Sequence, residues 1–240
     1  MTEKLLTECD FSYLDENYAV IKENIAQAAV ASGRRPEDVT FMAVTKTVAP
    51  PPINHVISLG VDLIGENKVQ ELLSKLEFLN TDRLRMHIIG HLQSNKVRKI
   101  VGIVSGVESV DSISLAEEIS KRCVQSDCKM DVLLEVNIGN EEAKTGFTYD
   151  EALERAFEIA EMPNVNLRGF MAVPPICEGD TVRRYFAKMN GLYLDAKEKL
   201  SGKAIIDTLS LGMSADYADA IKEGSTLVRV GSSLFGARRY

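Results

Sequence analysis

Short runs of apolar and β-branched residues alternate along this chain with longer stretches whose apolar positions recur at helical spacing. A first helix is predicted over Tyr13–Ser32, where Gly33 and Pro36 act as stop signals. The candidate strands that follow are Thr40–Thr45, Leu63–Gly65, Met86–Ile89, Val107–Val110, Asp131–Val136, Leu167–Met171, Thr208–Leu211 and Leu227–Val230. Helical patterns between them cover Lys68–Phe78, Asn95–Val101, Ser114–Ser126, Tyr149–Ala160, Thr181–Leu200 and Ala215–Glu223.

Strands that alternate with helices predict an α/β fold with a parallel sheet and right-handed crossovers. About eight such units favour a closed (β/α)8 TIM-type barrel with an extra N-terminal helix. No linker divides the sequence, so residues 1–240 are interpreted as one domain. A doubly wound sheet is the alternative, because periodicity does not show closure. The absence of a G-x-G-x-x-G motif weakens its dinucleotide-binding version, and the absence of G-x-x-x-x-G-K-[ST] excludes a nucleotide P-loop.

Composition narrows the class of protein. Hydrophobic residues make up 45% and charged residues 26%, with a net charge of −7, which disfavours a nucleic-acid partner. No apolar run approaches the roughly 18 residues of a membrane span, and the acidic N-terminus is unlike a secretory signal. The four cysteines lack metal or redox spacing and are interpreted as free thiols in a reducing cytoplasm. No long apolar interface stripe is evident, so a monomer is expected.

Lys46 is the first candidate functional residue. Strand alternation places it on the same face as Met42 and Val44. Functional groups of a (β/α)8 barrel project from the C-terminal ends of the strands and from the following loops. A lysine there ordinarily extends into solvent, whereas a partly desolvated amine has a lowered pKa and can attack an aldehyde. Lys46 alone leaves both interpretations open.

Glycine- and serine-containing loops follow the seventh and eighth predicted strands. The first contains Met213 and Ser214, and the second contains Gly231 and Ser232. These loops are a recurrent phosphate-binding location in such barrels. Glycine lets backbone N–H groups approach phosphate oxygens, serine adds a hydroxyl donor, and Ser214 is placed to cap the helix predicted over Ala215–Glu223. Ordinary turn chemistry explains either loop alone, but their joint placement favours a phosphate site.

Arg229 lies within the last predicted strand. It points the opposite way from Val228 and Val230, and therefore into the barrel if the valines pack outward against helices. A guanidinium in an apolar interior requires an acceptor, either a protein carboxylate or a ligand. Both kinds of acceptor stay open at this point.

A reactive amine, a phosphate-binding pair of loops and an inward arginine together describe a site for pyridoxal 5'-phosphate (PLP). Lys46 would form a Schiff base, the loops would hold the phosphate and Arg229 would contact the pyridine nitrogen. An arginine disfavours protonation of that nitrogen, so the cofactor would be a poorer electron sink than one paired with a carboxylate.

An ordered set of motifs over nearly the whole chain resembles the PLP homeostasis protein family, also called YggS/PROSC. The matching segments are Ala43–Thr47, Gly65–Asn67, Val69–Glu71, His87–Gly90, Leu92–Lys96, Val136–Ile138, Arg168–Pro174, Leu209–Ser214 and Gly224–Arg238, together with Lys144 and Gly146. The resemblance implies a barrel like the N-terminal domain of alanine racemase, with PLP on the lysine of the first strand. Two departures are Val48, where many relatives have a second lysine, and Ser232–Ser233, where Thr-Ala is more usual.

By this resemblance, Lys46 forms the Schiff base, Asn67 lies near the cofactor and Arg229 faces the pyridine nitrogen. Ser214, Gly231 and Ser232 would hold the phosphate. The predicted cofactor-binding set is therefore Lys46, Asn67, Met213, Ser214, Arg229, Gly231 and Ser232.

A PLP carrier is favoured over an enzyme. Alanine racemase needs a second proton-transfer group, a tyrosine from a separate C-terminal β-domain, and the chain ends at Tyr240, so that domain is expected to be absent. We predict a protein that buffers PLP or delivers it to apo-enzymes without robust catalysis. An amino-acid racemase that uses His87 and Tyr217, near strand ends, is the alternative. A third possibility is a binding module whose PLP state signals to a protein partner.

No metal site is predicted. His87 and His91 are four residues apart, but the intervening Ile88–Gly90 lies at a strand-to-loop boundary and lacks the glutamate of a metalloprotease helix. Cys123 and Cys128 lack the further cysteines of a zinc site. For Lys144, a position at the barrel mouth and one on the open surface both stay open.

Overall fold

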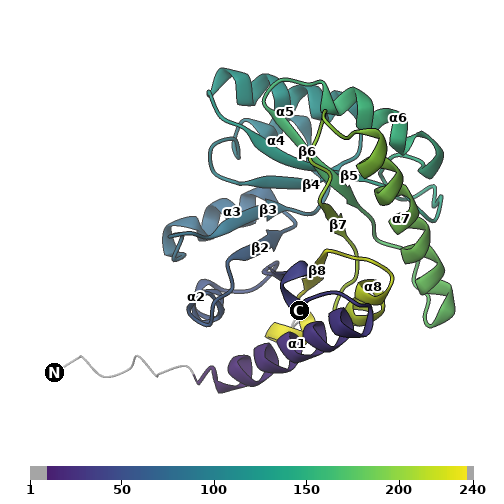
Figure 1. Cartoon of the computed structure of the whole chain (residues 1–240). Coiled ribbons are helices and arrows are strands. Elements are labelled where there is room, and N and C mark those ends of the chain that lie inside the picture. The colour runs from purple at the N-terminus through teal and green to yellow at the C-terminus, as the bar shows by residue number, and fades with distance from the viewer. Residues whose placement is uncertain (1–9, 237–240) are drawn as a thin grey trace.

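Eight parallel strands form a closed barrel in the order β1 to β8, each paired with its sequence neighbour and β1 paired with β8 (Figure 1). The computed structural model describes residues 10–236. The strands are β1 Thr40–Val44, β2 Leu63–Glu66, β3 Arg85–Ile88, β4 Gly106–Val110, β5 Met130–Glu135, β6 Val165–Met171, β7 Thr208–Ser210 and β8 Leu227–Val230. Every predicted strand is present, and closure settles the choice between a barrel and an open sheet.

Helices surround the barrel (Figure 1). In the described part of the chain they are α1 Ser12–Ala31, α2 Pro50–Ser58, α3 Val69–Lys75, α4 Ser94–Val97, α5 Ile113–Gln125, α6 Tyr149–Ala160, α7 Asp180–Lys199, α8 Tyr217–Lys222 and α9 Ser232–Phe235. Two 3₁₀ turns, Pro36–Asp38 and Leu76–Phe78, join them. Helix α6 has the predicted bounds because Thr148 Oγ1 accepts from the Glu151 N–H and Glu151 Oε1 accepts from the Thr148 N–H, a reciprocal capping box.

Two helix predictions were wrong in their limits. The helix predicted over Asn95–Val101 ends at Val97, because the following backbone closes i to i+3 turns and Gly102 has φ +79°. The helix predicted over Ala215–Glu223 is α8, which begins at Tyr217, and Ser214 does not cap it. The Asp216 carboxylate accepts from the Met213 N–H at 2.6 Å and closes a turn, so the helix begins only after Asp216.

The barrel has an outer and an inner core. Residues on the outer face of the strands, such as Val228 and Val230, belong to the large hydrophobic cluster shared with the helices. Met42, Leu63 and Leu227 form a separate, smaller cluster. Since Leu227 and the two valines alternate along β8, Arg229 shares the inward direction of Leu227, as predicted.

Helix α1 lies beside the C-terminal part of the chain (Figure 1). Asn17 Nδ2 donates to the Leu234 carbonyl at 2.9 Å, and Arg34 Nη1 donates to the Ser225 carbonyl at 2.8 Å. Asn17 thus holds α1 against α9, Asn24 holds it against α8 through the Tyr217 hydroxyl, and Arg34 holds the segment after α1 against the loop before β8. The N-terminal helix therefore brings its first turn toward the loop after β8.

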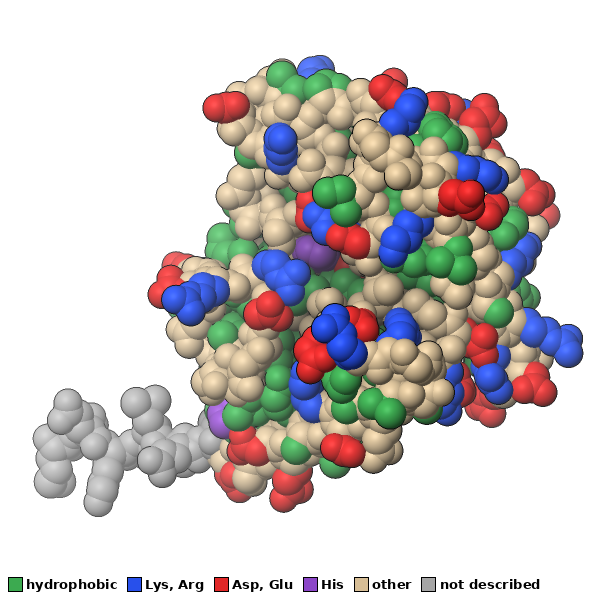
Figure 2. Space-filling view, in the orientation of Figure 1, with side chains coloured by type: hydrophobic (Ala, Val, Ile, Leu, Met, Phe, Trp, Pro, Cys, Tyr) green, Lys and Arg blue, Asp and Glu red, His purple; other side chains and the backbone are tan. Residues whose placement is uncertain are grey.

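The surface carries both signs of charge. Basic and acidic side chains are interspersed over the face shown in Figure 2, without a large patch of one sign. Within residues 10–236, no helix is both long and apolar enough to cross a membrane.

Candidate functional site

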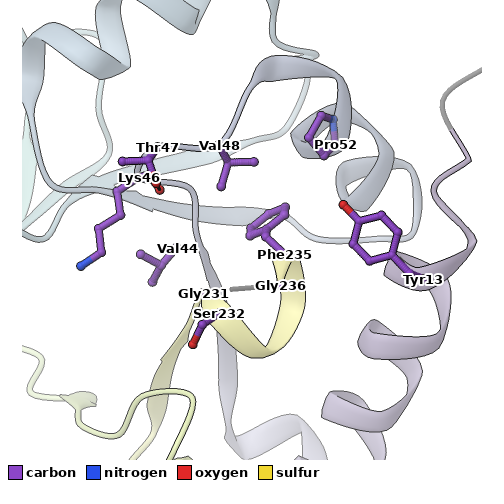
Figure 3. A pocket seen from close by; sticks show the side chains of 10 residues that line it. All are labelled: Tyr13, Val44, Lys46, Thr47, Val48, Pro52, Gly231, Ser232, Phe235 and Gly236. Carbon is purple, nitrogen blue, oxygen red and sulfur yellow. Dashed lines mark hydrogen bonds between the residues drawn. The ribbon is translucent and has the colours of Figure 1, made fainter. Parts of the chain in front are cut away.

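A cavity of about 220 Å³ lies between the end of β1 and the start of α9 (Figure 3). Half-buried Lys46 lines it together with Gly231 and Ser232, which follow β8. In Figure 3 the polar ends of Lys46 and Ser232 lie on one side of the pocket. The rest of the wall is formed by Tyr13, Val44, Thr47, Val48, Pro52, Phe235 and Gly236. The turn after β1 that carries Lys46 and the second predicted phosphate loop thus meet around one space.

The two predicted phosphate loops also meet each other. Ser214 Oγ accepts from the Gly231 N–H at 3.3 Å and from the Ser233 N–H at 3.2 Å. Gly231 packs closely against β1, where an added Cβ would lie 3.3 Å from both the Val44 carbonyl oxygen and its Cβ, which is tighter than an ordinary contact. Backbone donors and hydroxyl groups therefore converge beside β1, as a phosphate site requires.

Arg229 is almost fully buried, with 4% of its surface exposed. Its Nη1 donates to the Ser210 carbonyl at 2.7 Å and to Ser210 Oγ, and its Nη2 donates to the Ala172 carbonyl at 3.0 Å. Burial lowers the pKa of Arg229, while Glu108 and other carboxylates raise it. An arginine stays protonated under these conditions, so the barrel interior contains a fixed cation.

A buried lysine anchors the segment that contains Lys46. Lys75 is 8% exposed, and its Nζ donates to the Thr45 carbonyl at 2.9 Å, to Glu66 Oε1 at 2.7 Å and to Glu71 Oε1 at 2.6 Å. Three donors thus have three acceptors. We call Lys75, Glu66 and Glu71 the Lys75 cluster.

The Lys75 cluster binds the chain on both sides of Lys46. Thr45 Oγ1 donates to Glu66 Oε1 at 2.8 Å, and the Thr47 N–H donates to Glu71 Oε1. Thr47 has φ +64°, an unfavourable conformation for a β-branched residue, so these contacts oppose a local strain. Sequence reasoning missed this cluster, although the i, i+4 pair of Glu71 and Lys75 on a predicted helix was a readable signal.

The opposite side of the barrel mouth is acidic. Glu135 ends β5, and burial together with Asp111 raises its pKa from 4.5 to about 7. Thr145 Oγ1 lies 3.5 Å from Glu135 Oε2, and His91 Nδ1 lies 2.8 Å from an Asp111 carboxylate oxygen. Across residues 10–236, no three His, Cys, Asp or Glu side chains are grouped as metal ligands.

Glu135→Gln is expected to remove a pH-dependent part of the stability. The folded pKa of about 7 lies above the ordinary 4.5, so the contribution of this group is fully present below 4.5 and is lost as pH rises through 7. Between about pH 5 and about pH 8, urea unfolding should show the wild type losing ~2 kcal/mol more than the variant, after a discount for solvent at the mouth. Glu161→Gln, at a surface pair, is the control. Identical pH profiles for wild type and Glu135→Gln would contradict the assignment.

Other sequence candidates lie away from the cavity. Tyr217 belongs to the outer core and its hydroxyl accepts from Asn24 of α1 at 3.0 Å, so its assignment to the barrel mouth was wrong. His87 lies on β3 with its Nδ1 2.9 Å from Glu108, and His91 lies in the loop after that strand, half exposed. These positions confirm that the two histidines do not share one helix.

The remaining predicted residues are at the same end of the barrel. Asn67 directly follows β2, half-buried, and its backbone packs against Gly90. Met213 is 41% exposed in the turn before α8. Lys144 pairs with Glu141 and its Nζ lies 3.3 Å from the Pro174 carbonyl, which places it between the loops after β5 and β6. None of these side chains lines the cavity around Lys46.

The cysteines within the described residues are free thiols, as predicted. They are Cys123, Cys128 and Cys177, and burial raises the pKa of Cys123 to about 12. Cys9 lies outside the described residues.

Residues 17–239 match the family described as alanine racemase, N-terminal domain. The chain is 40% identical over 227 residues to the pyridoxal phosphate homeostasis protein of Aquifex aeolicus, covering 94% of this chain and 98% of that protein. This full-length similarity decides the family. The chain belongs to the pyridoxal phosphate homeostasis protein family.

Solved structures agree with this membership of the pyridoxal phosphate homeostasis protein family. An unknown protein from Bifidobacterium adolescentis has a TM-score of 0.89 at 34% identity, covering 97% of this chain and 98% of that chain. PipY of Synechococcus elongatus PCC7942 with PLP bound has a TM-score of 0.76 at 28% identity, covering 88% of this chain and 100% of that chain. The resemblance predicted from the motifs is confirmed, and so is the alanine racemase-like barrel.

Proposed function

We propose that this protein binds PLP as a Schiff base on Lys46 and acts in PLP homeostasis as a carrier or buffer. In forming that linkage the Lys46 amine attacks the aldehyde carbon, a C=N bond forms and one water leaves. The observation that carries the proposal is the meeting of Lys46 with Gly231 and Ser232 around one cavity, although they lie near opposite ends of the sequence.

The residues present fit the chemical groups of PLP. The N–H groups of Gly231 and Ser233 already point at one oxygen, Ser214 Oγ, and suit phosphate oxygens equally. The buried cation of Arg229 would face the pyridine nitrogen and disfavour its protonation. When bound, PLP supplies a reactive carbonyl carbon and an electron sink. The PLP-bound PipY structure, which shares this barrel, supports the assignment.

The two side chains predicted as the acid–base groups of a racemase lie away from the cavity, which supports a carrier over that racemase. Two-base racemisation needs a second proton-transfer group across the cofactor from the lysine. The Tyr217 hydroxyl is bound to Asn24 in the outer core, and His87 is paired with Glu108 inside the barrel. Neither side chain lines the cavity that contains Lys46. We expect a cytoplasmic monomer with PLP-dependent apo-enzymes as recipients.

The function is tested by loading and transfer. Protein incubated with PLP and dialysed should stay yellow, and added apo-enzyme should gain activity while the yellow band falls by a matching amount. Incubation with L- or D-amino acids should give negligible racemisation measured by chiral chromatography. A colourless protein after PLP treatment would contradict PLP binding. Robust racemisation that copurifies with the intact protein would contradict the carrier role and favour an amino-acid racemase.

A further inference from the structure

A chain of buried polar side chains crosses the inside of the barrel from β3 to β8. Arg229 Nη1 donates to Ser210 Oγ, and Ser210 Oγ donates to Glu108 Oε2 at 2.6 Å. Glu108 Oε1 lies 2.9 Å from His87 Nδ1. We call Arg229, Ser210, Glu108 and His87 the interior network. The cofactor-binding function proposed above uses only Arg229 of these four.

Three of the four side chains of the interior network are buried, whereas the His87 side chain is 13% exposed. Glu108 and Ser210 have 0% of their surface exposed and Arg229 has 4%. The His87 ring packs closely against Gly106, where an added Cβ would lie 2.8 Å from its Nε2. Buried polar groups with such complete partners hold one arrangement. The positions of the carboxylate, the hydroxyl and the guanidinium are therefore mutually fixed.

Glu108 is the counter-charge of Arg229. Burial opposes ionisation of Glu108, but His87, Arg229 and Ser210 outweigh it and hold its pKa below the usual value. Asp216 and Glu135 also act on Arg229 through space. Among the carboxylates of residues 10–236, only Glu108 is linked to the Arg229 guanidinium through a hydrogen-bonded hydroxyl, that of Ser210.

The bonds to the guanidinium are arranged so that its orientation depends on Ser210. Both terminal nitrogens donate to groups of the barrel wall, namely the carbonyls of Ser210 and Ala172 and the Ser210 hydroxyl. A serine hydroxyl has one proton, and here Glu108 receives it. The oxygen lone pairs of Ser210 are thereby directed at Arg229. A residue without an acceptor atom at position 108 would leave the hydroxyl proton undirected.

We propose that Glu108 is a positioning residue for the PLP site, which through Ser210 orients Arg229 and balances its charge. This inference rests on the proposed function, because Arg229 matters to the cofactor only if PLP occupies the cavity. Glu108 thus sets the net charge that the barrel interior presents to the pyridine ring. Without it, the guanidinium would lose its hydrogen-bonded counter-charge and would disfavour protonation of the cofactor nitrogens more strongly.

The test uses the visible absorption of the PLP-loaded protein as a function of pH. In Glu108→Gln the midpoint of the colour change should move to lower pH by about one unit, the effect of a unit charge on the order of 10 Å away at protein-like screening. Ser210→Ala, which keeps both carbonyl acceptors of Arg229, should move it in the same direction by less. Glu161→Gln, which removes a surface charge paired with Lys203, should not move it.

The outcomes separate the inference from the proposed function. If the wild type takes up no PLP, the proposed function is contradicted. If PLP-loaded Glu108→Gln changes colour at the same pH as the wild type, only the positioning role is contradicted. Thermal melting of the PLP-free proteins measures how much each substitution destabilises the fold. A variant that is less stable but changes colour at the wild-type pH would also contradict the inference. If Glu108→Gln does not fold, Ser210→Ala tests the inference in its place. A colour change of PLP-loaded Ser210→Ala at the wild-type pH would then contradict it.

Discussion

Lys46→Ala is expected to lose all covalent retention of PLP. The variant should be colourless after dialysis, and borohydride, which reduces a C=N bond to a stable C–N bond, should leave no phosphopyridoxyl group on the protein. The physical reason is that Lys46 is the amine that lines the cavity with Gly231 and Ser232. Peptide mass mapping of reduced wild type should place the added group on the peptide that contains Lys46.

The matched control for this variant is Lys144→Ala. Lys144 also lies at the barrel mouth, near the Pro174 carbonyl, but outside the cavity around Lys46. It should keep its colour and its borohydride-fixed cofactor. Ser214, Gly231 and Arg229 remain in Lys46→Ala, so PLP should still bind reversibly and weakly in equilibrium dialysis. Labelling of another lysine in the wild type, with Lys46 unmodified, would contradict the assignment.

The barrel was predictable because strand alternation and helical spacing can each be recognised within a short stretch of sequence. Alternation within β8 was enough to direct Arg229 inward, since the outward valines on each side pack against helices. Loop positions after β7 and β8 were enough to predict that Ser214 and Gly231 would lie together, because strands adjacent in a barrel end at the same mouth. The sequence pattern thus predicted which way the Arg229 side chain points and which loops lie beside each other.

Partners across the barrel were not predictable in the same way. Glu108 and Ser210 are 102 residues apart, and nothing in either segment indicates that their side chains meet. Helix α2 is not among the predicted helical stretches; it begins at Pro50, and proline is well suited to a first helical turn. Tyr217 was misplaced because its distance from a strand end does not show which face of α8 it occupies.

Lys75→Met is expected to destabilise the protein by about 3 to 5 kcal/mol, the cost of leaving buried carboxylates without their partner. Glu66 is 1% exposed as a side chain and Glu71 is 22% exposed, and both lie against the Lys75 ammonium. Methionine has a similar volume, so the loss would report charge and hydrogen bonds more than packing. Urea unfolding at neutral pH measures it. Lys199→Met, at an exposed pair with Asp195, should change stability by less than ~0.5 kcal/mol.

The destabilisation should shrink as pH falls. Burial already raises the pKa of Glu66 above its usual value, although Lys75 and Thr45 oppose the rise. Without the ammonium, the folded pKa of Glu66 rises further, so the carboxyl takes up a proton on acidification and the buried charge disappears. Glu66→Gln placed in Lys75→Met should recover part of the stability, because it removes the same charge at every pH. A pH-independent loss without recovery would contradict this account.

The same substitution connects stability to the cofactor site. The Lys75 cluster binds the Thr45 carbonyl and hydroxyl on one side of Lys46 and the Thr47 N–H on the other, where Thr47 has positive φ. With Lys75 removed, that segment can relax away from the geometry that directs Lys46 into the cavity. PLP uptake by the folded variant, followed by absorption, should therefore be slower and weaker than in Lys199→Met. A folded Lys75→Met that takes up PLP at the wild-type rate would show that the cluster supports the fold alone.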